Sequence, residues 1–299
     1  MKKVLAFLVT AVMLLSLSAC TLPKNSTELY KIYSTMKKVS SFHVTGTVTG
    51  NTSVRMLGLS FDVPFTVDAD FNFSSGQSHG TADVSLSLFD KTLDVGSEVY
   101  TAGDGTVYMK ETVCGEEDAD TRWSCFPRKD ATNSVSSENS FSLKELLTDE
   151  FFESLEYIHD REAGTFTIVV PLSGLTENPA VQTKLEEFFS SEKVSSLLPS
   201  DTKTRQTILE SLGQCTLTFV FDRSHHLTSL RLSEFSCELM SGGKLLSRTT
   251  TVHLVMNLEV DNYNQVEDIS IPEEIRNCAV SGDLSNSRLV SAFRSALSK

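Results

Sequence analysis

Basic residues are scarce in this sequence. It has 26 lysines and arginines against 39 aspartates and glutamates, which gives a formal net charge of -13. Binding to nucleic acid needs clustered lysine and arginine side chains that release counterions from the phosphates. Electrostatic binding to anionic lipid headgroups needs the same side chains. The composition therefore argues against nucleic acid as a partner and against membrane attachment through surface charge.

The motifs of the common enzyme classes are missing as well. The sequence has no Gly-x-Ser-x-Gly elbow, no glycine-rich phosphate loop and no His-Glu-x-x-His pair. We therefore expect a protein that is not an enzyme and has no cofactor. A hydrolase whose catalytic residues are dispersed along the chain is the remaining enzymatic alternative, because such a site leaves no local motif.

Long apolar runs are absent after the first twenty residues. There, Lys2 and Lys3 precede an apolar run over residues 4–17, which ends in Leu17-Ser18-Ala19-Cys20. The run is too short to span a bilayer, and the basic start and small residues at its end are typical of a secretory signal peptide. An ordinary signal peptide with a chance cysteine is the plainer interpretation.

The last four residues of this segment, 17–20, resemble the signal of bacterial lipoproteins. In that family the cysteine is acylated and the peptide before it is removed, and two or three acyl chains hold a protein firmly to a membrane. The resemblance implies a signal peptide over residues 1–19, an acylated Cys20 and a tether through residue 25. We therefore expect an extracytoplasmic protein, anchored to a bacterial membrane by the lipid on Cys20.

Five cysteines remain once the acylated one is set aside. In an oxidising exterior the economical pairing is Cys114 with Cys125 and Cys215 with Cys237, the second across a predicted hairpin, which leaves Cys278 over. Several other pairings stay open. A zinc site is the rival interpretation, but no cysteine stands in a C-x-x-C pair or close to histidine, so we expect no metal.

Hydrophobic periodicity predicts the elements of the chain. A helix over about residues 26–39 has one apolar stripe. The clearest strand follows at 61–73, where apolar and polar residues alternate strictly. A strand with one wet and one apolar face indicates an antiparallel sheet. Its apolar side consists of Phe61, Val63, Phe65, Val67, Ala69, Phe71 and Phe73.

Further strands are predicted up to residue 109 and again over 165–170, 215–221, 230–235 and 252–260, with helices over 143–155, 179–198 and 201–212. We interpret residues 26–275 as a single α+β domain with a helical insert near 140–212. The expected fold is a curved antiparallel sheet, a half-barrel, with helices covering its concave face. We expect residues 276–299 to form a tail with a short helix.

Two groups of side chains that could in principle bind a metal ion are interpreted as ordinary surface residues. His225 and His226 are adjacent in a predicted turn, where neighbouring side chains seldom converge on one ion. The acidic segment 116–120 lacks the ligand spacing of a calcium loop. We expect both groups to be solvated.

Several features together resemble a family of lipoprotein carriers. They are Cys20, a helix that runs into Met36-Lys37-Lys38-Val39-Ser40-Ser41-Phe42-His43-Val44, long alternating strands and a closing Val266-Glu267-Asp268-Ile269-Ser270-Ile271-Pro272. The chain resembles the LolA-like and LppX/LprG-like carriers over most of residues 25–275. The resemblance implies a half-open barrel with a helical lid, in which several members carry lipids. The loop 114–125 and the tail depart from it.

Two functions follow as hypotheses. The first is a non-enzymatic, membrane-tethered lipoprotein that binds a lipid or another hydrophobic molecule, with Phe61, Phe65, Val67, Phe71 and Phe73 lining the site. The same stripe would equally well fill an ordinary core. The second is a cell-envelope module without a small-molecule ligand, which presents its acidic face and the Trp123 loop to a protein partner.

Overall fold

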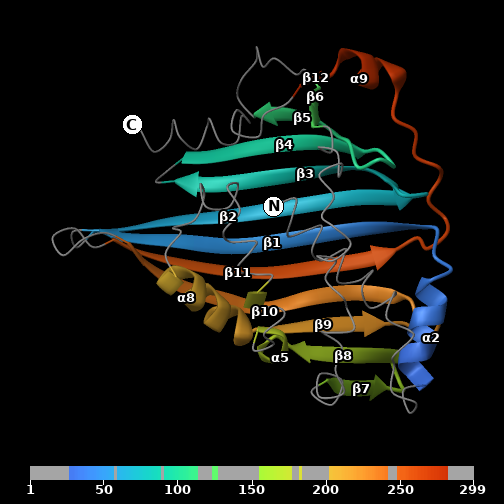
Figure 1. Ribbon diagram of the computed structural model, residues 1–299, viewed down its shortest axis with the longest axis horizontal. Coiled ribbons are helices and arrows are strands. Elements are labelled where there is room, and N and C mark those ends of the chain that lie inside the picture. Colours follow the sequence, from blue (N-terminus) through green and yellow to red (C-terminus); the bar gives the residue numbers. More distant parts are fainter. Residues whose placement is uncertain are drawn as a thin grey trace. The chain divides into compact units, whose positions relative to one another are not determined.

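The computed structural model describes residues 27–56, 59–88, 91–113, 123–126, 155–176, 182–183, 202–241 and 248–281. The chain divides into two compact units, one formed by residues 1–39 with 136–235 and the other by residues 40–135 with 236–299. Strands dominate the described part of both units (Figure 1). None of the described helices is long and apolar enough to cross a membrane.

The second unit is built on eight described strands. They are β1 (Ser41–Met56), β2 (Leu59–Ser74), β3 (Gln77–Leu88), β4 (Lys91–Thr101), β5 (Val107–Val113), β6 (Ser124–Phe126), β11 (Arg248–Asp261) and β12 (Val280–Ser281), with one short helix, α9 (Glu273–Cys278). Their order across the sheet is β12-β6-β5-β4-β3-β2-β1-β11. Neighbours are antiparallel except β12 and β6, which run parallel.

A two-residue turn sets the register between β2 and β3. Ser75 and Gly76 both have positive φ angles, 51° and 77°, as a type I′ hairpin requires. This turn places Ser74 opposite Gln77 and Phe71 opposite Gly80. Because a slip of one residue would exchange the two faces of a strand, the turn keeps the alternation of β2 in step with that of β3.

The register sorts the residues of this sheet into an apolar face and a polar face. Residues directly opposite each other on neighbouring strands lie on the same face. The apolar row through Val44 includes Phe71 on β2 and Val260 on β11. The neighbouring polar row through His43 includes Asn72 and Asp261. The predicted alternation of residues 61–73 is confirmed.

The first unit contains four strands and three helices among its described residues. They are α2 (Thr27–Met36), β7 (Glu156–Asp160), β8 (Thr165–Pro171), α5 (Ser173–Thr176), α8 (Thr202–Gly213), β9 (Thr216–Phe221) and β10 (Leu227–Ser241), which belongs to this unit as far as Phe235. The strand order is β10-β9-β8-β7, all antiparallel. Every second residue of β8 and β9 is buried.

The helix α2 is held to this unit by one apolar stripe and one polar contact. Leu29 and Ile32, three residues apart on one side of the helix, are buried. Glu28 accepts a hydrogen bond from His225 Nε2 at 2.7 Å, from the turn between β9 and β10. The predicted helix over residues 26–39 is confirmed for residues 27–36.

The expected half-barrel with helices over its concave face is wrong. In the described part of the chain the helices are 4 to 12 residues long, whereas β1 and β2 have 16 residues each, and no described helix covers a concave face. Neither unit closes its described strands into a barrel, because β12 in the second unit and β7 in the first have a neighbour on one side only. The described part is therefore mainly open sheet.

The physical reason lies in what the helices can cover. The α8 helix, which confirms the prediction for residues 201–212, packs against α5. The helices expected over 143–155 and 179–198 lie almost entirely outside the described residues, and Leu155 directly precedes β7. A strand that is apolar on one face does not by itself determine whether a helix covers that face.

Candidate functional site

The apolar face of the second unit changes character along its strands. Near the start of β1 it is a closed core that contains Val44, Phe71, Val84, Val95, Met109, Met256 and Leu258, all buried. Toward the hairpin between β1 and β2 the side chains are only half-buried, and Leu59 is 61% exposed. One apolar face is thus divided into a buried part and a partly exposed part.

The half-buried part is a continuous surface across five strands, which we name the apolar patch. It consists of Val54, Phe61, Val63, Phe65, Leu86, Leu93, Val252 and Leu254. Phe65 lies opposite Gly50 on β1 and opposite Leu86 on β3, and Leu86 lies opposite Leu93. Apolar surfaces that stay partly exposed mark sites for ligands, partner proteins or membranes.

Glycines let aromatic rings lie flat against this face. A Cβ atom at Gly50 would collide with the ring of Phe65, and one at Gly80 would collide with the backbone and ring of Phe71. The two rings therefore occupy space that a side chain on the neighbouring strand would take. The rings cover the backbone of Gly50 and Gly80, and the surface that they present outward is apolar.

The five residues predicted to line a hydrophobic site lie together on β2, but they do not share one environment. Phe71 is buried, and Phe73 stacks on Phe42 with ring centroids 4.8 Å apart. Phe61, Phe65 and Val67 are half-buried. Phe71 thus belongs to the core, and the half-buried Phe73 forms an aromatic pair with Phe42, while Phe61 and Phe65 belong to the apolar patch.

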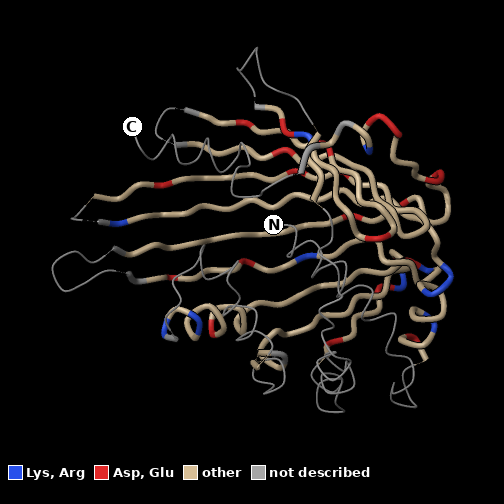
Figure 2. Tube along the Cα trace, turned by 45° about the horizontal axis from the view of Figure 1, so that its top comes forward, with Lys and Arg blue, Asp and Glu red and all other residues tan. Residues whose placement is uncertain are grey.

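Acidic residues recur along the strands of the same sheet (Figure 2), and many of them belong to its polar face. The register places on it Asp62, Asp68, Asp70, Asp83, Asp94, Glu98, Glu259 and Asp261. Hydroxyl groups on neighbouring strands donate to some of them: Thr47 to Asp68 at 2.7 Å and Ser85 to Asp94 at 2.6 Å. These contacts bind adjacent strands together through side chains.

One histidine connects three strands on this face. His43 on β1 contacts Asp261 on β11 through Nδ1 at 2.7 Å and Asp70 on β2 through Nε2 at 3.0 Å. Both ring nitrogens can donate only when the imidazole is protonated. Burial lowers the pKa of His43, but the hydrogen bonds to Asp261 and Asp70 outweigh it and leave the pKa raised. The geometry therefore favours an imidazolium between two carboxylates.

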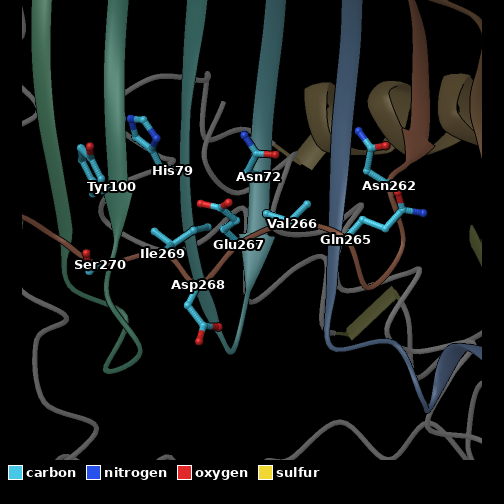
Figure 3. A pocket seen from close by; sticks show the side chains of 10 residues that line it. All are labelled: Asn72, His79, Tyr100, Asn262, Gln265, Val266, Glu267, Asp268, Ile269 and Ser270. Carbon is cyan, nitrogen blue, oxygen red and sulfur yellow. The ribbon is translucent and has the colours of Figure 1, made fainter.

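An open cleft of about 570 Å³ lies on the same face, next to this histidine. Three sheet residues line it, Asn72 on β2, His79 on β3 and Tyr100 on β4. The other wall is the segment after β11, residues 262–270, which we name the strap. The strap contributes Asn262, Gln265, Val266, Glu267, Asp268, Ile269 and Ser270 (Figure 3).

Aromatic and acidic groups organise the sheet side of this cleft. The His79 and Tyr100 rings are stacked, with centroids 4.0 Å apart, and Tyr100 also contacts Trp123 at 5.6 Å. His79 Nε2 lies 3.2 Å from Glu98 Oε1. Burial raises the pKa of the Tyr100 hydroxyl, and the charge of Glu98 adds to the effect. Tyr100 therefore presents a neutral hydroxyl at neutral pH.

The strap is fixed to the sheet at two places. The Asn264 side chain accepts hydrogen bonds from the Ser40 amide at 2.8 Å and the Ser40 hydroxyl at 3.0 Å. Asp268 accepts from Ser74 Oγ at 3.2 Å. Glu267 and Asp268 point to opposite sides of the strap (Figure 3). The walls of the cleft are thus held in place before any ligand arrives.

The two turn histidines have separate carboxylate partners. His225 bonds Glu28, while His226 Nδ1 lies 3.7 Å from Asp222. No group of three or more possible metal ligands occurs among the residues described. The acidic segment 116–120 lies outside the described residues.

The described residues include part of the expected cysteine pairing. Cys125, Cys215 and Cys237 are thiols in this structure, and Cys114 lies outside the described residues. The register of β9 with β10 pairs Leu217 with Leu232, so Cys215 falls opposite residue 234. The expected pairing of these cysteines stays a prediction. Burial raises the pKa of the Cys215 thiol.

Sequence reasoning missed the polar cleft and the histidine bridge. His43 lies on the polar side of β1, but its partners are 27 and 218 residues away in the chain. One usable signal was the Ser75-Gly76 dipeptide, because a two-residue turn there places Asn72 opposite His79. The neighbouring strand β11 and the strap had no comparable local signal.

Known proteins offer little further guidance. No protein-family model matches this chain, and no curated protein matches it either. Among solved structures it is similar to a DUF1329 family protein from Desulfovibrio piger ATCC 29098 at 8% sequence identity and a TM-score of 0.18, over 83% of this chain and 95% of that one. A TM-score this low does not establish a shared fold.

Proposed function

We propose that this protein is a membrane-tethered extracytoplasmic lipoprotein without catalytic activity, and that the apolar patch binds a lipid or a similar hydrophobic molecule. The patch is the observation that carries the proposal. It continues a closed core on the same face, yet its side chains remain half-buried. Such a surface gains free energy, about 25 cal/mol for each Å² of apolar area, when a hydrophobic ligand covers it.

The amino-terminal segment supports a lipid as the ligand. Residues 17–20 resemble a lipoprotein signal, and an acylated Cys20 would keep the sheet beside a membrane, where hydrophobic molecules of low solubility are concentrated. The likeness to LolA-like and LppX/LprG-like carriers points to the same class of ligand. The ligand site proposed here is the sheet surface itself, not a cavity beneath a helical lid.

Native mass spectrometry of the full chain with Cys20→Ala, purified from a bacterial envelope, tests this proposal. We expect a stoichiometric adduct that solvent extraction releases as a lipid. The double variant Phe65→Ser/Leu254→Ser should lose most of the adduct, because it places two hydroxyls in the apolar patch.

Thr49→Ala/Thr66→Ala is the matched control. These two threonines lie opposite each other on the polar face, one residue from Gly50 and Phe65. The control should retain the adduct. Circular dichroism confirms that both variants fold. An apo mass for the parent protein, or an adduct equally abundant in both double variants, would refute lipid binding at the patch.

The carboxylates of the polar face favour a second candidate function, that of a cell-envelope module binding a basic partner protein. Electrostatic recognition of this kind weakens at high ionic strength. Cross-linking in intact cells, followed by capture at low and high salt, should recover a partner that Asp62→Asn/Asp68→Asn loses. A partner that is insensitive to both salt and these substitutions would contradict an acidic docking face.

A further inference from the structure

We propose that the polar cleft between the sheet and the strap binds a neutral, hydroxyl-rich ligand, namely a short glycan. The inference is independent of lipid binding, because the cleft is lined from the polar face of the sheet and the apolar patch lies on the other. The cleft volume of about 570 Å³ is within the usual range for small-molecule sites, roughly 300–1,000 Å³.

The charged side chains that line the cleft disfavour anionic ligands. Its lining contains two carboxylates, Glu267 and Asp268, and neither lysine nor arginine. Asp268 already accepts hydrogen bonds from Ser74 and Ser75. A phosphate or carboxylate ligand would therefore meet negative charge without compensation, and recognition of such groups relies on arginine or lysine.

Three carboxamides give the cleft its affinity for hydroxyl groups. Asn72 comes from β2, and Asn262 and Gln265 come from the strap. Each carboxamide donates and accepts hydrogen bonds, as does each sugar hydroxyl. The Tyr100 hydroxyl and Ser270 add two more groups of the same dual character. Neighbouring hydroxyls on a sugar ring would find a donor and an acceptor from each wall.

The aromatic residues favour a sugar over an organic cation. A cation is held over open ring faces, as in an aromatic cage. Here the Tyr100 ring stacks on His79 and contacts Trp123, so the rings pack on one another. Together with Val266 and Ile269 they offer apolar edges against which the C–H groups of a sugar can rest.

The cleft is also ready to bind without rearrangement. Asn264 and Asp268 fix the strap to the sheet, and Ile271, directly after it, is buried. Walls that are held in place lower the conformational entropy lost on binding. Asn262 and Asn264 have positive φ angles, 51° and 57°, which asparagine tolerates better than most residues do.

Trp123, the sole tryptophan of the chain, provides a direct readout because it contacts Tyr100. Fluorescence titrations of the purified full chain should use maltotetraose and chitotetraose as neutral glycans, choline as a cation and inorganic phosphate as an anion. We expect saturable binding of at least one glycan, seen also by saturation-transfer NMR, and no binding of choline or phosphate.

Two single substitutions locate the site. Asn72→Leu and Gln265→Ala should each weaken glycan binding roughly three- to tenfold, the usual effect of losing one or two hydrogen bonds. Asn257→Ala removes an exposed carboxamide from the same face of β11, outside the cleft, and should leave binding unchanged. The failure of both glycans to bind, equal loss in all three variants, or cleft-dependent binding of choline or phosphate would each overturn the assignment.

Discussion

The two faces of the sheet in the second unit are stabilised by different means. On the apolar face, burial of side chains such as Phe71 and Val95 removes hydrocarbon from water. On the polar face, neighbouring strands are joined by directional contacts, of which His43 with Asp70 and Asp261 connects three strands. Burial on the apolar face is non-directional, whereas the contacts on the polar face fix the positions of individual side chains.

Substitutions on the apolar face should cause the largest change in the free energy of unfolding. Phe71→Ala should destabilise the protein by about 3–5 kcal/mol, because it leaves a cavity in a closed core. Phe61→Ala, on the same strand and face but within the apolar patch, should cost about 1 kcal/mol or less, since its side chain is half-buried. Urea unfolding of both variants gives the comparison. Equal losses would mean that the patch is an ordinary part of the core.

The histidine bridge predicts a smaller, pH-dependent effect. The folded pKa of His43 is raised above 6.5, so its contribution to stability is complete below that pH and is lost as the pH rises through the folded pKa. His43→Gln should therefore cost stability at about pH 6 but little at about pH 9. The effect should be about 1 kcal/mol or less, because Asp70 and Asp261 are 58% and 67% exposed.

Urea unfolding at several pH values checks this prediction. Thr45→Ala serves as the control because Thr45 is the next residue of β1 on the same face and does not titrate. Its cost should not change with pH. A constant difference between wild type and His43→Gln across this range would show that the imidazole is not charged in the folded protein.

The contact between α2 and the β9–β10 turn should give the smallest effect. Hydrogen bonds from Lys31 and His225 lower the pKa of the Glu28 carboxyl below its usual value of about 4.5. The stability that these hydrogen bonds contribute is therefore present above about pH 4.5 and is lost as the pH falls through the pKa of Glu28 in the folded protein. Glu28→Gln should cost about 0.5 kcal/mol at neutral pH.

Hydrogen exchange can resolve this change better than global unfolding. In Glu28→Gln the amides of α2 should exchange faster with solvent at neutral pH. The amides of β8 and β9 should exchange at an unchanged rate, because Leu29 and Ile32 still hold the helix in place and the change stays local. Unchanged exchange in α2 would show that its buried stripe alone positions the helix. The result separates polar positioning from apolar burial in the first unit, as the His43 series does in the second.

The sequence alone determined the two-sided strands. Alternation at period two is a local property, and it correctly predicted the faces of β2, the strands around residues 165–170 and 215–221, and the helices at 27–36 and 202–213. It also assigned Phe61, Phe65, Val67, Phe71 and Phe73 to one face. The signal at Cys20 stays a prediction, because residues 1–26 lie outside the described part of the chain.

The tertiary structure decided which strands are neighbours, and with that the sites. Periodicity indicates that a face is apolar but not what covers it. It therefore could not separate Phe71 in the core from Phe61 in the patch, nor reveal that the described helices do not cover the sheet. The partners of His43 and the strap beside Asn72, His79 and Tyr100 come from strands and turns far apart in the chain. Such contacts depend on the free energy of pairing between strands that are far apart in the chain, and a local sequence pattern does not contain that information.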